Sequence, residues 1–313
     1  MDNLVSIIIP AYNRADLIVS TLESIRHQTH KEFECLIIDD DSNDNTAEVV
    51  QLFIESDNRF QFYKRPISKI KGPNSCRNYG FEKAKGNFIY FFDSDDFLKP
   101  HALETYIKAF KSDTDGVLAQ VERVDRQTGI LQDTNTIESN NLIEDYFTYK
   151  ICYFVCGILW KKSFLDAQNQ LFDELIGNHD EWDFNLRMIY VQPKIEKIKQ
   201  PLVVYYQYEE SFKNEILKGN DLELKSAFRA RFKHLAILEK MDSKNKIKYT
   251  KHIADYYKKT VRNKLYAKQR KWIPYYRKAI GLYLKLKDYS AITKFTIGII
   301  VFKITGKGYS FFE

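Results

Sequence analysis

Two apolar segments in the first hundred residues run directly into clusters of aspartates, and this feature constrains the fold most strongly. Residues 33–38 lead into the acidic stretch 39–41, and residues 88–92 lead into the acidic stretch 93–96. Continuous apolar runs are typical of strands that are buried on both faces of a parallel sheet. Acids at strand ends are common in turns and helix caps, but each cluster holds more of them than a cap needs.

Strand and helix patterns alternate through this part of the chain. An apolar β-branched run at 5–9 ends at Pro10, apolar residues recur at helical spacing over 15–28, and further helical segments precede the strand at 88–92. Strand, crossover helix and strand in succession predict a right-handed, mostly parallel sheet with helices on both faces. Because parallel strands end at one edge, both acidic clusters should face one crevice, where open α/β folds bind ligands.

The spacing of the second cluster suits a divalent cation. Asp93 and Asp95 stand two residues apart beyond a strand, so they could share an oxygen-seeking cation with the phosphates of a ligand. A calcium loop beginning at Asp39 is excluded, because Asp44 stands where glycine is needed and Val50 where glutamate is needed. The chain has no GxxxxGKS/T, no GxGxxG and no serine nucleophile elbow, which weakens the kinase and dinucleotide-binding interpretations.

The charge of the chain changes sign near residue 210. Residues 1–210 hold 23 Lys and Arg against 34 Asp and Glu, a net −11, whereas residues 211–313 hold 25 against 8, a net +17. Before this point we expect a hairpin over 117–131, a strand over 154–160 and a short helix over 182–190. Beyond it the pattern becomes helical and rich in tyrosine. The sequence therefore predicts an acidic α/β domain followed by a basic helical region.

The first hundred residues carry a resemblance to a known family. The run VSIIIPAYNRADLIVSTLESIRHQTHKEFECLIIDDDSNDNT, followed by GPNSCRNYGFEKAKGNFIYFFDSDDFLKP, closely resembles family 2 glycosyltransferases of the GT-A fold. Several separate motifs occur in the family's order across most of residues 4–100. The resemblance implies a GT-A (nucleotide-diphospho-sugar transferase) catalytic domain over 1–210 and a nucleotide-sugar donor.

The resemblance also implies roles for the residues around the donor. It assigns contacts with the nucleotide base to residues of the first strand, its loop and the end of the second strand: Pro10, Ala11, Tyr12, Asn13, Asp39 and Asp40. Arg77 matches a position that contacts the nucleotide. Asp93, Ser94 and Asp95 match the family's DXD motif. Asp95 is the expected direct ligand of Mn²⁺ or Mg²⁺, and Asp93 is expected nearer the ribose.

A second acidic pair matches the place where the family keeps its catalytic base. The sequence DEWDF at 180–184 precedes Arg187, with the two acids in the reverse of the family's order. Counting back six residues from Arg187 gives Glu181 as the base, with Asp180 as the alternative and plain helix capping as the competing interpretation. Sugar transfer with inversion needs a carboxylate to take the proton of the acceptor hydroxyl, and a cation to take up charge on the leaving diphosphate.

These residues predict an inverting, metal-dependent glycosyltransferase of the hexosyltransferase type. Its donor would be a nucleotide sugar, first of all a UDP-sugar, and its acceptor a hydroxyl of a glycan or lipid-linked acceptor in surface polysaccharide biosynthesis. The rival hypothesis is a catalytically inactive nucleotide-sugar-binding module whose basic tail is the interaction surface. Metal-dependent turnover distinguishes the two.

Three interpretations remain open for the basic region 211–313. Its lysines and the apolar stretch 297–304 could attach to an anionic membrane surface, it could be a helical cap or oligomer contact, or it could bind nucleic acid, for which no motif is present. No apolar run approaches the roughly 20 residues of a membrane span. Four cysteines without a secretory leader after Met1 predict a reducing compartment. We therefore expect a cytoplasmic protein, peripheral at the inner face of the plasma membrane under the first interpretation.

Overall fold

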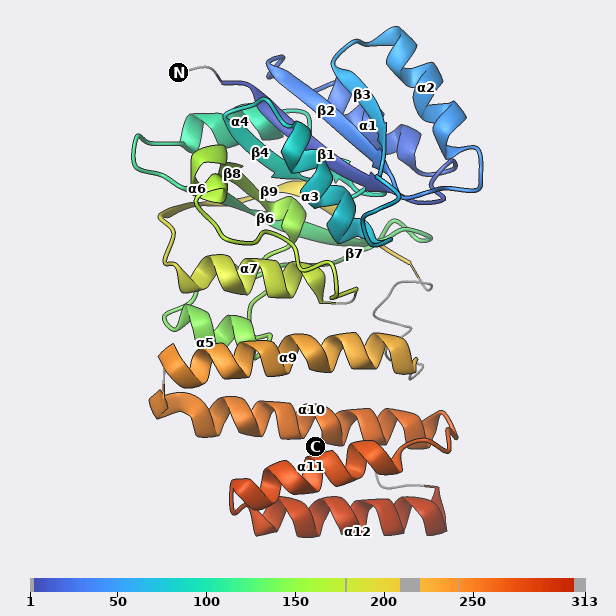
Figure 1. The fold of residues 1–313 in the computed structure, drawn as a ribbon, viewed down its shortest axis with the longest axis vertical. Helices are drawn as coiled ribbons and strands as arrows, with labels where there is room; N and C mark the ends of the chain where they lie inside the picture. The colour runs from blue at the N-terminus through green and yellow to red at the C-terminus, as the bar shows by residue number, and fades with distance from the viewer. Residues whose placement is uncertain (1–2, 178, 209–219, 242, 307–313) are drawn as a thin grey trace. The chain divides into compact units, whose positions relative to one another are not determined.

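The computed structural model describes residues 3–177, 179–208, 220–241 and 243–306. The chain forms two compact units, Met1–Tyr208 (unit 1) and Glu209–Glu313 (unit 2) (Figure 1). Unit 1 is an α/β domain, and the described part of unit 2 is helical.

Unit 1 is built on one sheet of nine strands in the order β3-β2-β1-β4-β8-β6-β9-β5, with β7 paired to β6. The strands are β1 (Val5–Ala11), β2 (Phe33–Asp39), β3 (Phe60–Lys64), β4 (Phe88–Phe91), β5 (Phe97–Leu98), β6 (Gly116–Asp125), β7 (Leu131–Thr134), β8 (Ile158–Lys161) and β9 (Ile195–Gln207). The half from β3 to β4 is parallel, as the apolar runs predict. Beyond β4 the sheet is mixed, because β8 pairs antiparallel with both β4 and β6 while β9 runs parallel to β6.

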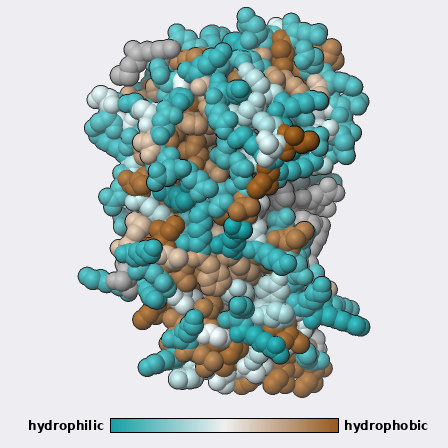
Figure 2. Space-filling model, viewed as in Figure 1, coloured by the Kyte–Doolittle hydropathy of each residue, from teal (hydrophilic) through white to brown (hydrophobic). Residues whose placement is uncertain are grey.

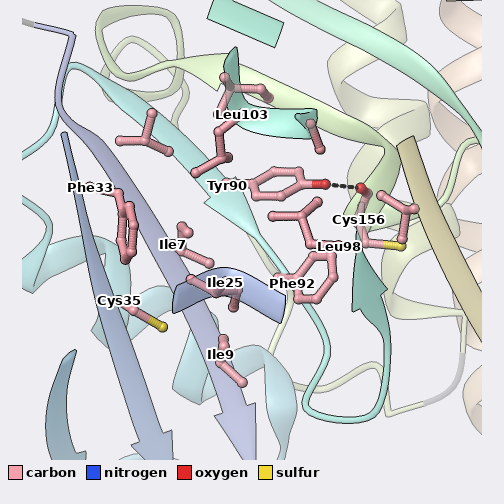
Figure 3. Packing of buried hydrophobic residues seen from close by; sticks show 14 of the residues in the cluster. Ile7, Ile9, Ile25, Phe33, Cys35, Tyr90, Phe92, Leu98, Leu103 and Cys156 are labelled. Atoms are coloured by element: carbon pink, nitrogen blue, oxygen red, sulfur yellow. Dashed lines mark hydrogen bonds between the residues drawn. The ribbon is translucent and has the colours of Figure 1, made fainter. Parts of the chain in front are cut away.

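Helices cover both faces of this sheet. They are α1 (Ile18–Arg26), α2 (Thr46–Ser56), α3 (Pro73–Lys83), α4 (Ala102–Ala109), α5 (Leu142–Phe147), α6 (Lys162–Asp166) and α7 (Asp180–Tyr190). The odd-numbered residues of β1 pack with α1, α2 and α4 in the core of one face, which Figure 3 shows around Ile7, Ile9 and Tyr90. The opposite face carries α3, where a side chain at Gly80 would place its Cβ 2.3 Å from Cγ2 of Ile8. Such close packing explains why β1 is buried along its whole length.

The expected strand over 154–160 is correct only in its second half. Val155–Gly157 forms a short 3₁₀ turn, η1, and the strand begins at Ile158. The backbone N–H of Val155 donates to the Glu181 carboxylate (2.8 Å) instead of to a neighbouring strand. A long-range contact with α7 therefore takes the place of a ladder hydrogen bond here.

Unit 2 contains α9 (Asp221–Met241), the 3₁₀ turn η2 (Ser243–Asn245), α10 (Lys246–Tyr266), α11 (Ile273–Lys285) and α12 (Tyr289–Thr305). Its interior is aromatic, with Phe228 of α9 stacked on Tyr257 of α10. The Lys264 ammonium is buried against the Asp221 carboxylate (2.8 Å), which also accepts from Tyr275 (3.0 Å). A search of the described helices finds none that is long and apolar enough to cross a membrane.

Candidate active site

The loop that follows β1 is joined to the loop that follows β2. Asn13 has a left-handed backbone conformation (φ 51°), its N–H donates to Ser42 Oγ (3.0 Å), and its side-chain oxygen accepts from the N–H of Asn43 (3.0 Å). Pro10 and Ala11 are buried within β1, whereas Tyr12 is 41% exposed. Of the residues expected around a base, the loop side chains are thus held at the surface and the strand residues support them.

Asp39 and Asp40 have different surroundings, although they are neighbours at the end of β2. Both are buried. One oxygen of Asp39 accepts from the N–H of Ser42 (3.2 Å), while Oδ1 has no hydrogen-bond partner in the described part of the chain. Asp40 has two donors on one oxygen, since its Oδ1 accepts from Arg65 and from the N–H of Gly72 (3.1 Å) at the start of α3. Asp39 is therefore open to a donor from a ligand, and Asp40 positions α3.

The acids after β4 lie close together, and few positive charges compensate theirs. Burial, and then the neighbouring Asp93 carboxylate, raises the pKa of Asp95 to about 6. The Arg14 guanidinium lies 3.7 Å from the Asp95 carboxylate, and Arg126 donates to the Asp95 carbonyl (3.1 Å). Ser94, between the two acids, is buried. This pair of hard oxygen donors fits a divalent cation.

These acids fit a cation that is also coordinated by the phosphates of a bound ligand. The described residues contain no group of three or more His, Cys, Asp or Glu that could hold a metal ion. One carboxylate oxygen of Asp93 already accepts a hydrogen bond from Arg77. The protein ligands available to a cation are therefore Asp95 and the other oxygen of Asp93. Magnesium and manganese sites of this kind are completed by phosphate oxygens and water.

Arg77 joins the two acidic motifs. Its guanidinium is buried, and it donates to the Asp93 carboxylate (2.7 Å) and to the Asp180 carboxylate (2.7 Å). Arg77 stands one helical turn before Gly80, whose close contact with β1 holds α3 against the sheet. The nucleotide contact expected for Arg77 remains a prediction. In the structure the Arg77 guanidinium holds Asp93, after β4, beside Asp180 at the start of α7.

The two candidate bases at the start of α7 also differ. Asp180 is paired with Arg77, whereas no ion pair to Glu181 is present among the described residues. The Glu181 carboxylate is partly buried, and its Oε2 accepts from the N–H of Val155 (2.8 Å). Burial, and then the charges of Asp180 and Asp93, raises the pKa of Glu181 to about 8. A carboxylate whose pKa is raised by burial and by neighbouring acids is typical of catalytic sites.

An aromatic group lies beside Glu181. Trp182 is buried, and the ring of Tyr149 stacks on it at 5.6 Å with an interplanar angle of 6°. Tyr149 and His179 both have left-handed backbone conformations (φ 62° and 66°), and their side chains are hydrogen-bonded to each other. The sequence pattern does not predict these aromatic contacts or the position of Arg126 beside Asp95, because the residues come from distant segments. Arg14 lies within the segment that resembles the family, so its position near the site could have been predicted.

The fold and this edge of the sheet define a class, the GT-A glycosyltransferases. Residues 6–167, more than half of the chain, match the model of Glycosyl transferase family 2. The chain belongs to this family.

Three known proteins illustrate the relationship. The putative glycosyltransferase EpsH of Bacillus subtilis is 28% identical over 210 residues, which cover 64% of this chain and 60% of EpsH. The GalNAc(5)-diNAcBac-PP-undecaprenol beta-1,3-glucosyltransferase of Campylobacter jejuni is 37% identical over 103 residues, 33% of each chain. The crystal structure of S. aureus TarS 1–349 in complex with UDP-GlcNAc has a TM-score of 0.56 at 17% identity, covering 91% of this chain and 90% of TarS. The match spans less than two thirds of the length of these curated relatives.

Proposed function

We propose that this chain is an inverting, metal-dependent glycosyltransferase that moves a hexosyl group from a UDP-sugar to a hydroxyl of a glycan or lipid-linked acceptor in surface polysaccharide biosynthesis. The observation that carries the proposal is the Arg77 bridge. Hydrogen bonds of 2.7 Å join one guanidinium to Asp93, which we assign to the donor side, and to Asp180, which we assign to the acceptor side. A transferase needs both groups within reach of one anomeric carbon.

The end of β2 suits the base of the donor. The buried Asp39 Oδ1 lacks a protein donor in the described residues, and a buried acceptor left unsatisfied costs about 1 to 3 kcal/mol. An N–H of a uracil ring would satisfy it, with Tyr12 and Asn13 beside it. TarS, which shares the fold, is known in complex with UDP-GlcNAc, and this supports a UDP-sugar as donor.

The acids after β4 suit the diphosphate. Asp95 and Asp93 would hold Mn²⁺ or Mg²⁺, which when bound supplies positive charge for the leaving diphosphate. Arg14 lies 3.7 Å from Asp95, and Arg126 lies beside its carbonyl. Both guanidinium groups would add charge compensation on the same side of the sugar.

Glu181 suits the role of general base. Deprotonated Glu181, with a pKa near 8, has a higher proton affinity than an ordinary carboxylate and would take the proton of the attacking hydroxyl. Asp180 is the weaker candidate because Arg77 already compensates its charge. Attack from the side of Glu181, opposite the diphosphate, inverts the anomeric carbon. The Campylobacter relative is named for an undecaprenol-linked acceptor, which supports a lipid-linked acceptor here.

The test measures binding and turnover separately. UDP-, GDP-, CMP- and dTDP-sugars are offered with and without Mn²⁺ to the full chain, and hydrolysis or transfer is followed together with calorimetric binding. Glu181→Gln should keep nucleotide binding and lose roughly 10²- to 10⁴-fold in turnover, the range of general base catalysis. Full turnover in this variant would remove Glu181 from the mechanism. Nucleotide binding without any metal-dependent turnover by the wild type would favour the inactive binding module.

A further inference from the structure

Helix α12 carries an exposed apolar stripe along one side. The unit buries Phe295, Gly298 and Ile299 of this helix. Four other apolar side chains are 44 to 78% exposed: Tyr289, Ile297, Ile300 and Ile304. At 100° per residue these four positions fall within an arc of about 80°. A helix at the surface of a soluble unit normally turns such a side inward, so α12 has one apolar side more than its own unit uses.

The segment that holds this stripe is strongly basic. Residues 267–306 contain nine Lys and Arg but a single acid, Asp288, so the segment has a net charge of +8. Asp288 is already engaged, since it caps α12 through the N–H of Ala291 (3.0 Å) and pairs with Lys251 (2.6 Å). Lys294 and Lys303 are exposed, and helical geometry places one on each side of the stripe. The charge near the stripe is therefore uncompensated by acids of the same segment.

Helix α11 extends the same character. Ile273 and Leu284 are 45 and 52% exposed, and Lys278 and Lys285 are exposed on the same helix. Within the described part of the chain no ion pair involves either lysine. Figure 2 shows brown, apolar atoms between teal side chains over the part of this unit that holds α11 and α12. We call the exposed residues of α12 and these four residues of α11 the α12 face.

We propose that the α12 face binds an anionic lipid bilayer, with the stripe at the level of the upper acyl chains and the lysines among the headgroup phosphates. Apolar residues flanked by basic ones are typical of helices that lie in a membrane interface. With 17 residues and two lysines, α12 would lie along the surface, since no described helix is long and apolar enough to cross a membrane. A second copy of the chain would oppose one net charge of +8 to another, and nucleic acid offers no apolar layer for the stripe.

The test is co-sedimentation of the full chain with vesicles. Vesicles of phosphatidylglycerol and phosphatidylcholine in equal parts are compared with pure phosphatidylcholine, at about 50 mM and about 1 M NaCl, where the Debye length is only about 3 Å. The wild type should bind the anionic vesicles at low salt and be released at high salt. No binding at low salt would overturn the proposal.

Two pairs of variants separate the α12 face from charge in general. Ile297→Ser/Ile300→Ser/Ile304→Ser should abolish binding, whereas the equally exposed Leu222→Ser/Met241→Ser/Ile247→Ser should retain it. Lys278→Gln/Lys285→Gln/Lys294→Gln should lower the partition coefficient by about 100-fold, at roughly fivefold per basic residue. The exposed control Lys225→Gln/Lys240→Gln/Lys244→Gln removes the same charge from α9 and η2 and should change it little.

Folding and assembly are measured on the same samples. Circular dichroism should show equal helix content in all variants. Equal losses in a test variant and its control would overturn the proposal, because the binding would then have no defined face. So would sedimentation velocity showing a wild-type dimer that the isoleucine variant converts to a monomer, since a second copy would then cover the stripe.

Discussion

Replacing Glu181 by glutamine should stabilise unit 1. The pKa of this carboxyl rises from 4.5 to about 8 in the folded chain, so the folded state holds a proton at pH 7 that the unfolded chain has released. A raised pKa gives stability that is complete below pH 4.5 and is lost as the pH rises through 8. The free energy of unfolding falls by about 1.4 kcal/mol for each pH unit between the two pKa values. The wild type is therefore less stable by about 3 kcal/mol at pH 7 and by about 5 kcal/mol above pH 9 than it would be with the carboxyl protonated in both states. Glutamine keeps an oxygen for the N–H of Val155 and has no proton to lose.

The measurement is urea unfolding at pH 5, 7 and 8.5, followed by tryptophan fluorescence, in which Trp160 and Trp182 report on unit 1 and Trp272 on unit 2. The advantage of Glu181→Gln in the free energy of unfolding should be below about 1 kcal/mol at pH 5, about 3 at pH 7 and larger at pH 8.5. Glu48→Gln, on the exposed side of α2, is the matched control and should show no such trend. A glutamine variant that is no more stable than wild type at pH 8.5 would refute the reasoning, because Glu181 would then not be desolvated.

Three further predictions follow from the same geometry. Asp95→Asn should weaken Mn²⁺-dependent UDP binding by at least about 10-fold in calorimetry and leave metal-free binding unchanged; equal binding with Mn²⁺ would exclude Asp95 as a ligand. Arg77→Met leaves two carboxylates without their partner and should cost about 3 to 5 kcal/mol in urea unfolding, a loss that Arg77→Lys should partly restore. Gly80→Ala places a Cβ 2.3 Å from Ile8 and should cost about 1 to 3 kcal/mol, whereas Gly281→Ala, in open space on α11, should gain about 0.5 to 1 kcal/mol; the reverse order of melting temperatures would contradict the packing.

Much of unit 1 could be predicted because its signals are local. The apolar runs of β1, β2 and β4 require burial on two faces, and the helical periods between them require crossovers, so a parallel arrangement follows. Once the strands are parallel, their acids must meet at one edge. The strand expected at 154–160 failed at η1 for the opposite reason, since the Glu181 carboxylate, and not the local sequence, binds the Val155 backbone.

The sequence by itself determined which chemical groups this protein has at the edge of its sheet. Only the tertiary structure decided how those groups are charged and shared. Arg77 turned out to bind both Asp93 and Asp180, and desolvation singled out Glu181 from its neighbour. On α12, apolar residues surround the whole helix, so periodicity could not show which side stays exposed. Burial and electrostatic environment depend on contacts between distant segments, and a one-dimensional pattern does not contain those contacts.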